Sequence, residues 1–174
     1  LIIKYSAEGE VKWARNIGGN VEVEILSVAG TSDGGYVVGG YFNGNSIQVG
    51  NETLTSNGKY DGLIIKYSSE GEVEWAKSFG GSSNDEINSV TGTSDGDYVV
   101  GGYFTSSIQV GDYNLTNNGN SDGLIIKYEM QEKSNPIVTN ARDIGGRYGN
   151  RINSVAGTSD GGYIVGGYFS GSIQ

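Results

Sequence analysis

The stretch GTSDGDYVVGGYF, Gly92 to Phe104, decides the fold because the chain carries it three times in nearly the same form. Its counterparts are GTSDGGYVVGGYF at Gly30 to Phe42 and GTSDGGYIVGGYF at Gly157 to Phe169. Similarity that returns at a fixed long spacing indicates one structural unit that has been copied along the chain. The unit, rather than any single motif, therefore sets the architecture.

A second shared segment, LIIKY, gives the length of the unit. It begins at Leu1, Leu63 and Leu124, so that the first two repeats are 62 and 61 residues long. We divide the chain, taken as one domain 1–174, into repeats 1–62, 63–123 and 124–174, of which the last is incomplete. The chain also opens inside a repeat, so we expect it to be a piece of something longer.

The composition favours an all-β protein. Thirty-one glycines stand against one proline, while 36% apolar and 18% charged residues are ordinary for a globular domain. Glycine at this density without a collagen triplet is typical of many short strands that are joined by tight turns. The sequence therefore predicts an all-β fold.

Each full unit contains four strand-like runs. In the second copy and its neighbourhood they are Val73 to Phe79, Ile87 to Thr93, Tyr98 to Phe104 and Gly123 to Tyr128. Four antiparallel strands that are copied radially describe a blade of a β-propeller. The extra length of the unit lies in a polar hairpin, Ser107 to Gly119, which we expect between the second and third strands.

Several segments resemble the repeats of bacterial seven-bladed propellers known as SBBP repeats. They are SIQVG, LTSNG, DGLIIKYS, GEVEW and GTSDGGYVVGGYF, and they recur over nearly the whole chain. A fainter similarity to kelch repeats lies in Gly101-Gly102 and in the pair Tyr67 and Trp75. The resemblance implies a propeller fold and a module that is secreted or displayed on a bacterial surface, without an assigned activity.

The order of the strand-like runs also predicts how the molecule assembles. The chain begins with the outer half of one blade and ends with the inner half of another, so that two whole blades lie between two complementary halves. Three blades are too few for an ordinary ring, and propellers protect their edges by closure. We expect self-association into a six-bladed dimer, or closure onto further repeats of a longer parent chain.

Charge and missing residue types exclude several functions. A net charge of −9 argues against nucleic acid and against anionic membrane surfaces, and no apolar run reaches the length of a membrane span. With no cysteine and no histidine, triads built on either residue are impossible. We therefore predict no enzyme and no cofactor, although Asp85 and Glu86 leave open a glycosidase-like carboxylate pair.

One segment matches the spacing of a calcium-binding loop. The candidate ligands are Asn118, Asn120, Asp122 and Glu129, with a glycine, Gly123, at the sixth position. The competing interpretation is that the residues after Gly123 form a strand. The aspartates of the three TSDG segments, Asp33, Asp95 and Asp160, are interpreted as turn residues.

The loops that follow the paired glycines differ most between the repeats. We expect these loops on the same rim of the disc as the inserted hairpin, and the TSDGG turns on the opposite rim. Because recognition is usually placed on loops of a rigid scaffold, the candidate ligand contacts are Asn84, Asp85, Arg147, Tyr148 and Arg151. The predicted function is non-catalytic recognition or adhesion, with protein or glycan as ligand. The alternatives are a purely architectural, self-assembling repeat and a carboxylate-based enzyme acting on glycans.

Overall fold

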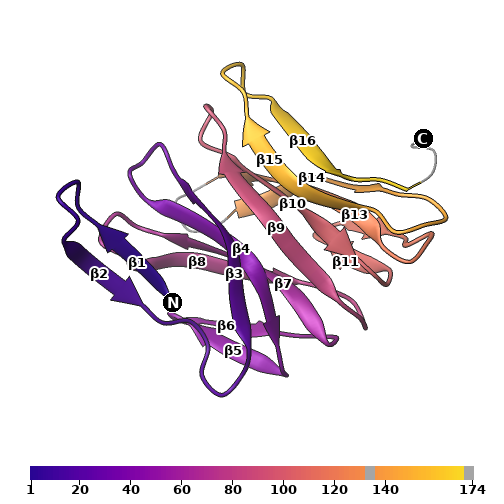
Figure 1. Ribbon diagram of the computed structural model, residues 1–174, viewed down its shortest axis with the longest axis horizontal. Helices are drawn as coiled ribbons and strands as arrows, with labels where there is room; N and C mark the ends of the chain where they lie inside the picture. The colour runs from indigo at the N-terminus through magenta and orange to yellow at the C-terminus, as the bar shows by residue number, and fades with distance from the viewer. Residues whose placement is uncertain (132–135, 171–174) are drawn as a thin grey trace.

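The computed structural model describes residues 1–131 and 136–170, and these residues form strands and turns with no helix (Figure 1). The predicted all-β class is confirmed. The strands are β1 (Ile2–Tyr5), β2 (Val11–Arg15), β3 (Val23–Gly30), β4 (Tyr36–Asn43), β5 (Ser46–Val49), β6 (Glu52–Thr55), β7 (Tyr60–Tyr67), β8 (Val73–Phe79), β9 (Asp85–Gly92), β10 (Tyr98–Phe104), β11 (Ile108–Val110), β12 (Tyr113–Leu115), β13 (Asp122–Met130), β14 (Pro136–Ile144), β15 (Arg151–Gly157) and β16 (Tyr163–Tyr168).

The strands form two four-stranded sheets and four two-stranded sheets, and every pairing between them is antiparallel. The four-stranded sheets have the orders β3-β4-β7-β8 and β9-β10-β13-β14, in which each strand pairs with the next strand of the same sheet along the chain. The hairpins β5-β6 and β11-β12 are inserted between the second and third strands of these sheets. The first and last pairs, β1-β2 and β15-β16, form two-stranded sheets.

The two large sheets share the same register. Val38 pairs with Ile65 in one sheet, and Val100 pairs with Ile126 in the other. The first strand of each sheet carries a bulge at corresponding places, between Ile25 and Ser27 and between Ile87 and Ser89. Residues that match in the sequence copies therefore occupy matching places in the two sheets.

The TSDGG segments are hairpin loops of three residues rather than tighter two-residue turns. Gly34 donates its N–H to the Thr31 carbonyl at 2.9 Å and has a φ of 81°. That left-handed φ is easily reached only without a Cβ, and it explains the glycine after each aspartate. Asp33 Oδ1 accepts the Gly35 N–H at 3.0 Å, so the aspartate closes its own loop.

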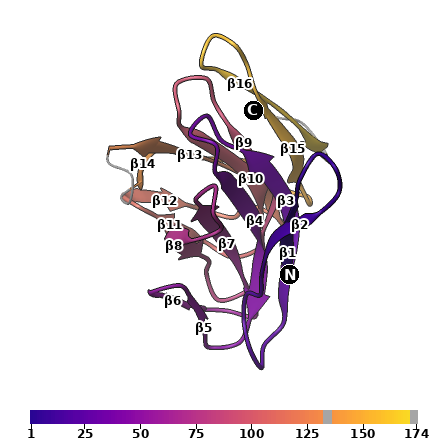
Figure 2. The same ribbon diagram turned by 90° about the vertical axis from the view of Figure 1, so that its left-hand side faces the viewer.

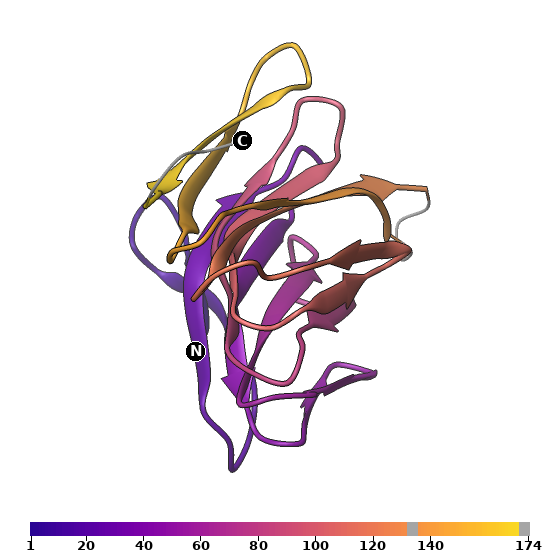
Figure 3. The same cartoon turned by 90° about the vertical axis from the view of Figure 1, so that its right-hand side faces the viewer.

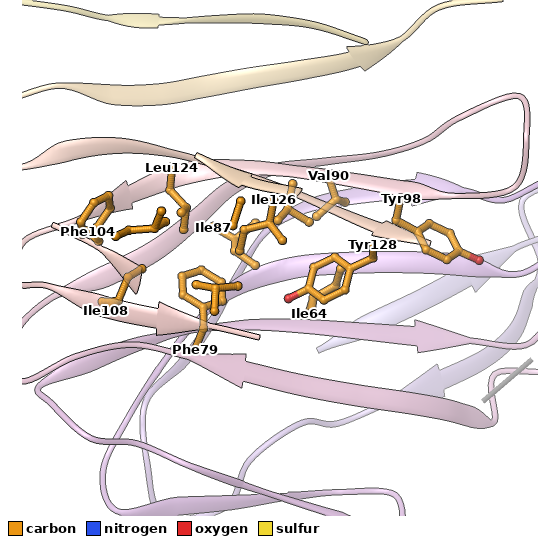
Figure 4. Close-up of a cluster of buried hydrophobic side chains, with 14 of the residues drawn as sticks. Ile64, Phe79, Ile87, Val90, Tyr98, Phe104, Ile108, Leu124, Ile126 and Tyr128 are labelled. Carbon is orange, nitrogen blue, oxygen red and sulfur yellow. The ribbon is translucent and has the colours of Figure 1, made fainter. Parts of the chain in front are cut away.

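The core lies between the faces of successive sheets. Strand β10 is buried along its whole length, as its continuous apolar sequence predicts, while β8 buries Trp75, Ala76 and Phe79 and exposes Lys77. Figure 4 shows side chains of β7, β8, β9, β10 and β13 converging between two sheets. Ile64 of the earlier sheet and Ile87 of the later one both lie fully buried in this cluster.

The first strands pack most closely across the sheets. The β9 backbone N–H of Val90 donates to Ser27 Oγ of β3 at 3.1 Å, and the N–H of Val155 in β15 donates to Ser89 Oγ of β9 at 3.1 Å. Small residues on these strands allow such a close approach. Figures 2 and 3 show β3 and β15 on one side of the molecule and β8 and β14 on the other.

Candidate functional site

The loops that follow the paired glycines lie beside the ends of the inserted hairpins. The N–H of Lys59 donates to the Ser83 carbonyl at 3.2 Å, and the N–H of Asn150 donates to the Ser121 carbonyl at 2.8 Å. Isolated parallel bridges join Tyr60 with Asn84 and Ser121 with Gly149. The loops are therefore next to the hairpin ends, as expected. We call the surface that residues 57–60, 81–85, 118–121 and 146–151 form together the loop face.

The five predicted contact residues do not share one environment on the loop face. Arg147, Tyr148 and Arg151 are exposed and Asn84 is half-buried, whereas the side chain of Asp85 is fully buried. The side chain of Asp85 has no solvent-exposed surface with which to contact a ligand, which contradicts its prediction as a ligand contact.

The backbone around it explains why Asp85 is buried. Its carboxylate accepts the N–H of Gly81 at 2.8 Å and the N–H of Thr105 at 3.1 Å, which ties the loop to the end of β10. Burial raises the pKa of Asp85 to about 6, although these two hydrogen bonds lower it. At the matching place in the third repeat, Asn150 Oδ1 accepts the N–H of Ser170 at 2.9 Å.

Two further carboxylates, which were not singled out from the sequence, accept backbone hydrogen bonds in the same way. Asp61 and Asp122 are fully buried, and each accepts a backbone N–H from the end of an inserted hairpin, from Asn57 and Asn118 respectively, both at 2.9 Å. The LIIKY repeat that follows each of them marks their position, but only the fold turns their side chains inward.

The proposed carboxylate pair is split by the pleat of β9. Asp85 is directed into the loop backbone, while Glu86 lies opposite Tyr103 in the strand register. Successive side chains of a strand point to opposite faces, so these two carboxylates do not act on one bond. The pKa of Tyr103 is raised mainly by burial and further by Glu86.

Arg151 faces the ring of Tyr103 from the next sheet. Its guanidinium carbon lies 4.5 Å from the ring centroid. The matching residue is Glu24 in the first repeat, where it accepts a hydrogen bond from the Tyr41 hydroxyl. Glu24, Glu86 and Arg151 therefore occupy the same position in the first strand of each repeat. Each of them lies beside a tyrosine of a second strand.

The predicted calcium ligands do not converge. Asp122 and Glu129 stand at opposite ends of β13, seven residues apart, which is about 23 Å along a strand. Glu129 lies 3.8 Å from Lys127 Nζ, and Asp122 accepts the Asn118 N–H. Across residues 1–131 and 136–170, no group of three or more acidic side chains is suited to hold a metal ion.

Lys66 and Lys127 form ion pairs at the end opposite the loop face. Lys66 is buried and lies 2.9 Å from Asp33 and 2.8 Å from Glu74, and Lys127 lies 2.9 Å from Asp97. The interpretation of the TSDG aspartates as turn residues does not include these partners. The lysine nevertheless recurs in every LIIKY segment, just as the aspartate recurs in every TSDG segment.

Two grooves lie on the outer side of the sheets, at corresponding places in successive repeats. They were not predicted from the sequence. Groove 1 has a volume of about 460 Å³ and lies between β8, the turn of hairpin β11-β12 and β14. Groove 2, of about 260 Å³, lies between β2, the turn of β5-β6 and the start of β8. Both are lined by a Gln-Val-Gly turn and by the tyrosine of LIIKY, Tyr128 in groove 1 and Tyr67 in groove 2.

One side chain explains why groove 2 is smaller. Arg15 spans it, donating to the Gly71 carbonyl at 2.7 Å and to Glu72 Oε1 at 2.8 Å. In groove 1 the matching residues are Lys77, which is exposed, and Ile137, which cannot pair with a cation. Groove 1 therefore lacks this bridge and stays open.

Groove 1 combines an apolar floor with charged side chains at its edge. Its floor contains the buried side chains of Phe79, Val110 and Tyr128, and exposed Lys77 and Asp112 stand at its edge. Its volume lies in the range of small-molecule sites, which are mostly apolar with a few polar groups.

No protein-family model matches the chain, and no curated protein matches it significantly. Within the two described ranges, no helix is long and apolar enough to cross a membrane.

Proposed function

We propose that the chain is a non-catalytic recognition module built as a β-propeller, with each four-stranded sheet as one blade. The meander order of both sheets, their face-to-face packing and the close approach of β3, β9 and β15 support this arrangement. The resemblance to SBBP repeats supports a location at a bacterial surface.

The observation that carries the recognition function is the open outer groove 1. It combines an apolar floor with one cationic and one anionic side chain at its edge. The matching groove 2, one repeat earlier, is bridged by Arg15. Because Lys77 and Asp112 can hydrogen-bond hydroxyl groups beside the apolar floor, we favour a glycan segment over a folded protein as the ligand.

A glycan array followed by calorimetry on the best glycan tests this function. We expect Lys77→Ala and Asp112→Ala to weaken binding by about tenfold or more, which corresponds to about 1.4 kcal/mol. Both side chains are exposed, so the melting temperature should stay unchanged.

Arg147→Ala is the matched control, since it removes an exposed cation from the loop face instead of the groove. If Arg147→Ala abolishes binding while the groove variants bind normally, the ligand lies on the loop face and groove 1 is the wrong site. If no glycan or protein is bound at all, recognition is refuted.

The second candidate function is architectural. It is favoured by the near identity of the repeats and the shared register of the two large sheets, since copied units that cover one another suit an assembly of many such units. A chain that assembles but binds no ligand would support this function over recognition.

A further inference from the structure

Groove 1 and groove 2 carry a cation at the same position of the outer strand. Arg15 of β2 matches Lys77 of β8, and each side chain lines the groove between its own strand and the next sheet. The walls of groove 1 come from the two four-stranded sheets and from the hairpin β11-β12, so they do not depend on the strands at either end of the chain. Arg15 and Lys77 are thus two versions of one site.

In groove 2 the cation is paired with a carboxylate of the chain itself. Glu72 Oε1 accepts a hydrogen bond from Arg15 Nη2 at 2.8 Å, and the Gly71 carbonyl accepts one from Arg15 Nε at 2.7 Å. Because 76% of the Glu72 side chain is exposed, this carboxylate lies at the outer edge of the groove. Groove 2 therefore contains an internal acid beside its cation.

Groove 1 keeps the cation but has lost the acid. The hairpin turns show which residues correspond, since Gly50 lies against Val73 and Gly111 lies against Val138. The residue before each valine is Glu72 in groove 2 and Ile137 in groove 1. Across residues 1–131 and 136–170, no carboxylate forms an ion pair with the exposed Lys77.

We propose that groove 1 binds a hexuronic acid residue of a glycan, and that Lys77 pairs with the carboxylate of this sugar. The acid of the ligand then takes the place that Glu72 occupies in groove 2. This inference rests on the proposed function, to which it adds the charge and the chemical class of the sugar.

The other walls of groove 1 fit the rest of such a sugar. Phe79 and Tyr128 provide an apolar floor for the C–H groups of the ring. Asp112 stands on the hairpin turn, where groove 2 has Asn51, and both side chains can accept hydrogen bonds from hydroxyl groups. Because Asp112 repels a carboxylate, the acid must lie toward Lys77 and the hydroxyl groups toward Asp112. The two charges thus set the orientation of the ligand.

The net charge of −9 acts only weakly on this site in physiological salt, because charges more than about 8 Å away are largely screened. Binding of the acid is therefore decided by the charges that line the groove. The pairing with Lys77 is itself exposed to salt, so the preference for an acidic sugar should decrease as the salt concentration rises.

Calorimetry on the full chain tests the proposal with oligosaccharides of galacturonic, glucuronic and mannuronic acid, each compared with its methyl ester. The ester keeps the sugar ring and removes the charge. The wild-type protein should bind at least one acid about tenfold more tightly than its ester, as expected for the loss of a hydrogen bond to a charged group. Lys77→Gln should bind the two forms equally, whereas Lys77→Arg should keep the preference.

Ile137→Glu restores the internal acid of groove 2, so that Lys77 pairs within the chain and the preference for the acidic sugar should be lost. Ile137→Gln is the matched control, because it has nearly the same shape without the charge, and it should keep the preference. Arg142→Gln should also keep it, since it removes the cation at the matching position of β14, which does not line groove 1. Every variant should retain the wild-type circular dichroism spectrum, which separates loss of binding from loss of folding.

The outcomes distinguish this inference from the proposed function. Equal binding of every acid and its ester by the wild type would overturn the inference and leave glycan recognition by groove 1 intact. A preference for the acid that persists in Lys77→Gln would overturn it as well, because the carboxylate would then be bound elsewhere. If the wild type binds no acidic and no neutral glycan, the proposed function is wrong and this inference is wrong with it.

Discussion

Asp85 should make the stability of the protein depend on pH in a specific direction. It is fully buried, and its pKa is raised by burial from 3.8 to about 6. The folded chain therefore holds the Asp85 proton more tightly than the unfolded chain does. The stabilisation that this proton gives is present below about pH 4 and is lost as the pH rises through 6.

The size of the effect follows from the distance between the two pKa values. One pKa unit is worth about 1.4 kcal/mol, so the loss from pH 4 to pH 8 is on the order of 3 kcal/mol. Asp85→Asn removes the titrating group but keeps one oxygen that can accept the Thr105 N–H, as Asn150 does with Ser170 in the third repeat. The amide leaves the Gly81 N–H without its acceptor, at a cost that does not change with pH.

Urea unfolding of both proteins, followed by circular dichroism at several pH values and one protein concentration, measures this effect. The free energy of unfolding of Asp85→Asn, relative to wild type, should rise by about 3 kcal/mol between pH 4 and pH 8. The comparison cancels the other carboxylates, which titrate in both proteins. If the two curves run parallel across this range, Asp85 is ionised in the fold at no cost and the reasoning is wrong.

Three further substitutions test the packing and the ion pairs. Phe104 is fully buried, so Phe104→Ala should lower the free energy of unfolding, measured with urea, by about 3–5 kcal/mol. Phe169 is the matching residue and is half-buried, so Phe169→Ala should lower it by clearly less. Equal losses in the two variants would contradict the packing described. Gly101→Ala should cost about 1–3 kcal/mol in the same assay because its Cβ meets Ile152, and an unchanged midpoint would show that the sheets pack less closely. Burial raises the pKa of Asp33, but hydrogen bonds, among them one from Lys66, outweigh it and hold the value at about 2. In Lys66→Ala this pKa should therefore rise, which NMR titration would detect, and a constant value would mean that the ion pair does not act on Asp33.

Sequence patterns predicted the secondary structure well where one face or both faces of a strand are buried. Two of the predicted strand-like runs, Tyr98 to Phe104 and Val73 to Phe79, form β10 and β8 with those bounds. The inserted hairpin between the second and third strands was also expected and is observed as β11-β12. Local hydrophobic period and glycine-marked turns carry this information, so a single sequence is enough to read it.

Predictions about individual polar residues were less successful. Asp85 was predicted as a ligand contact because its loop varies between the repeats, but two backbone N–H groups draw its side chain inward. The calcium-loop spacing at Asn118 to Glu129 does not bring its residues together, because β13 runs through the segment and separates Asp122 from Glu129. The outer grooves were not predicted, because their walls come from residues as far apart in the chain as Lys77 and Val138.

The sequence by itself determined that this protein is all-β, that its strands come in a repeated order, and where its turns lie. Each of these depends on residues close together in the chain, whose alternation and turn chemistry act locally. Only the tertiary structure decided which carboxylates are buried, which lysines pair with the TSDG aspartates, and where the outer grooves lie. These properties depend on which sheets meet face to face, and burial and electrostatic attraction act between groups that are adjacent in space whatever their separation along the chain.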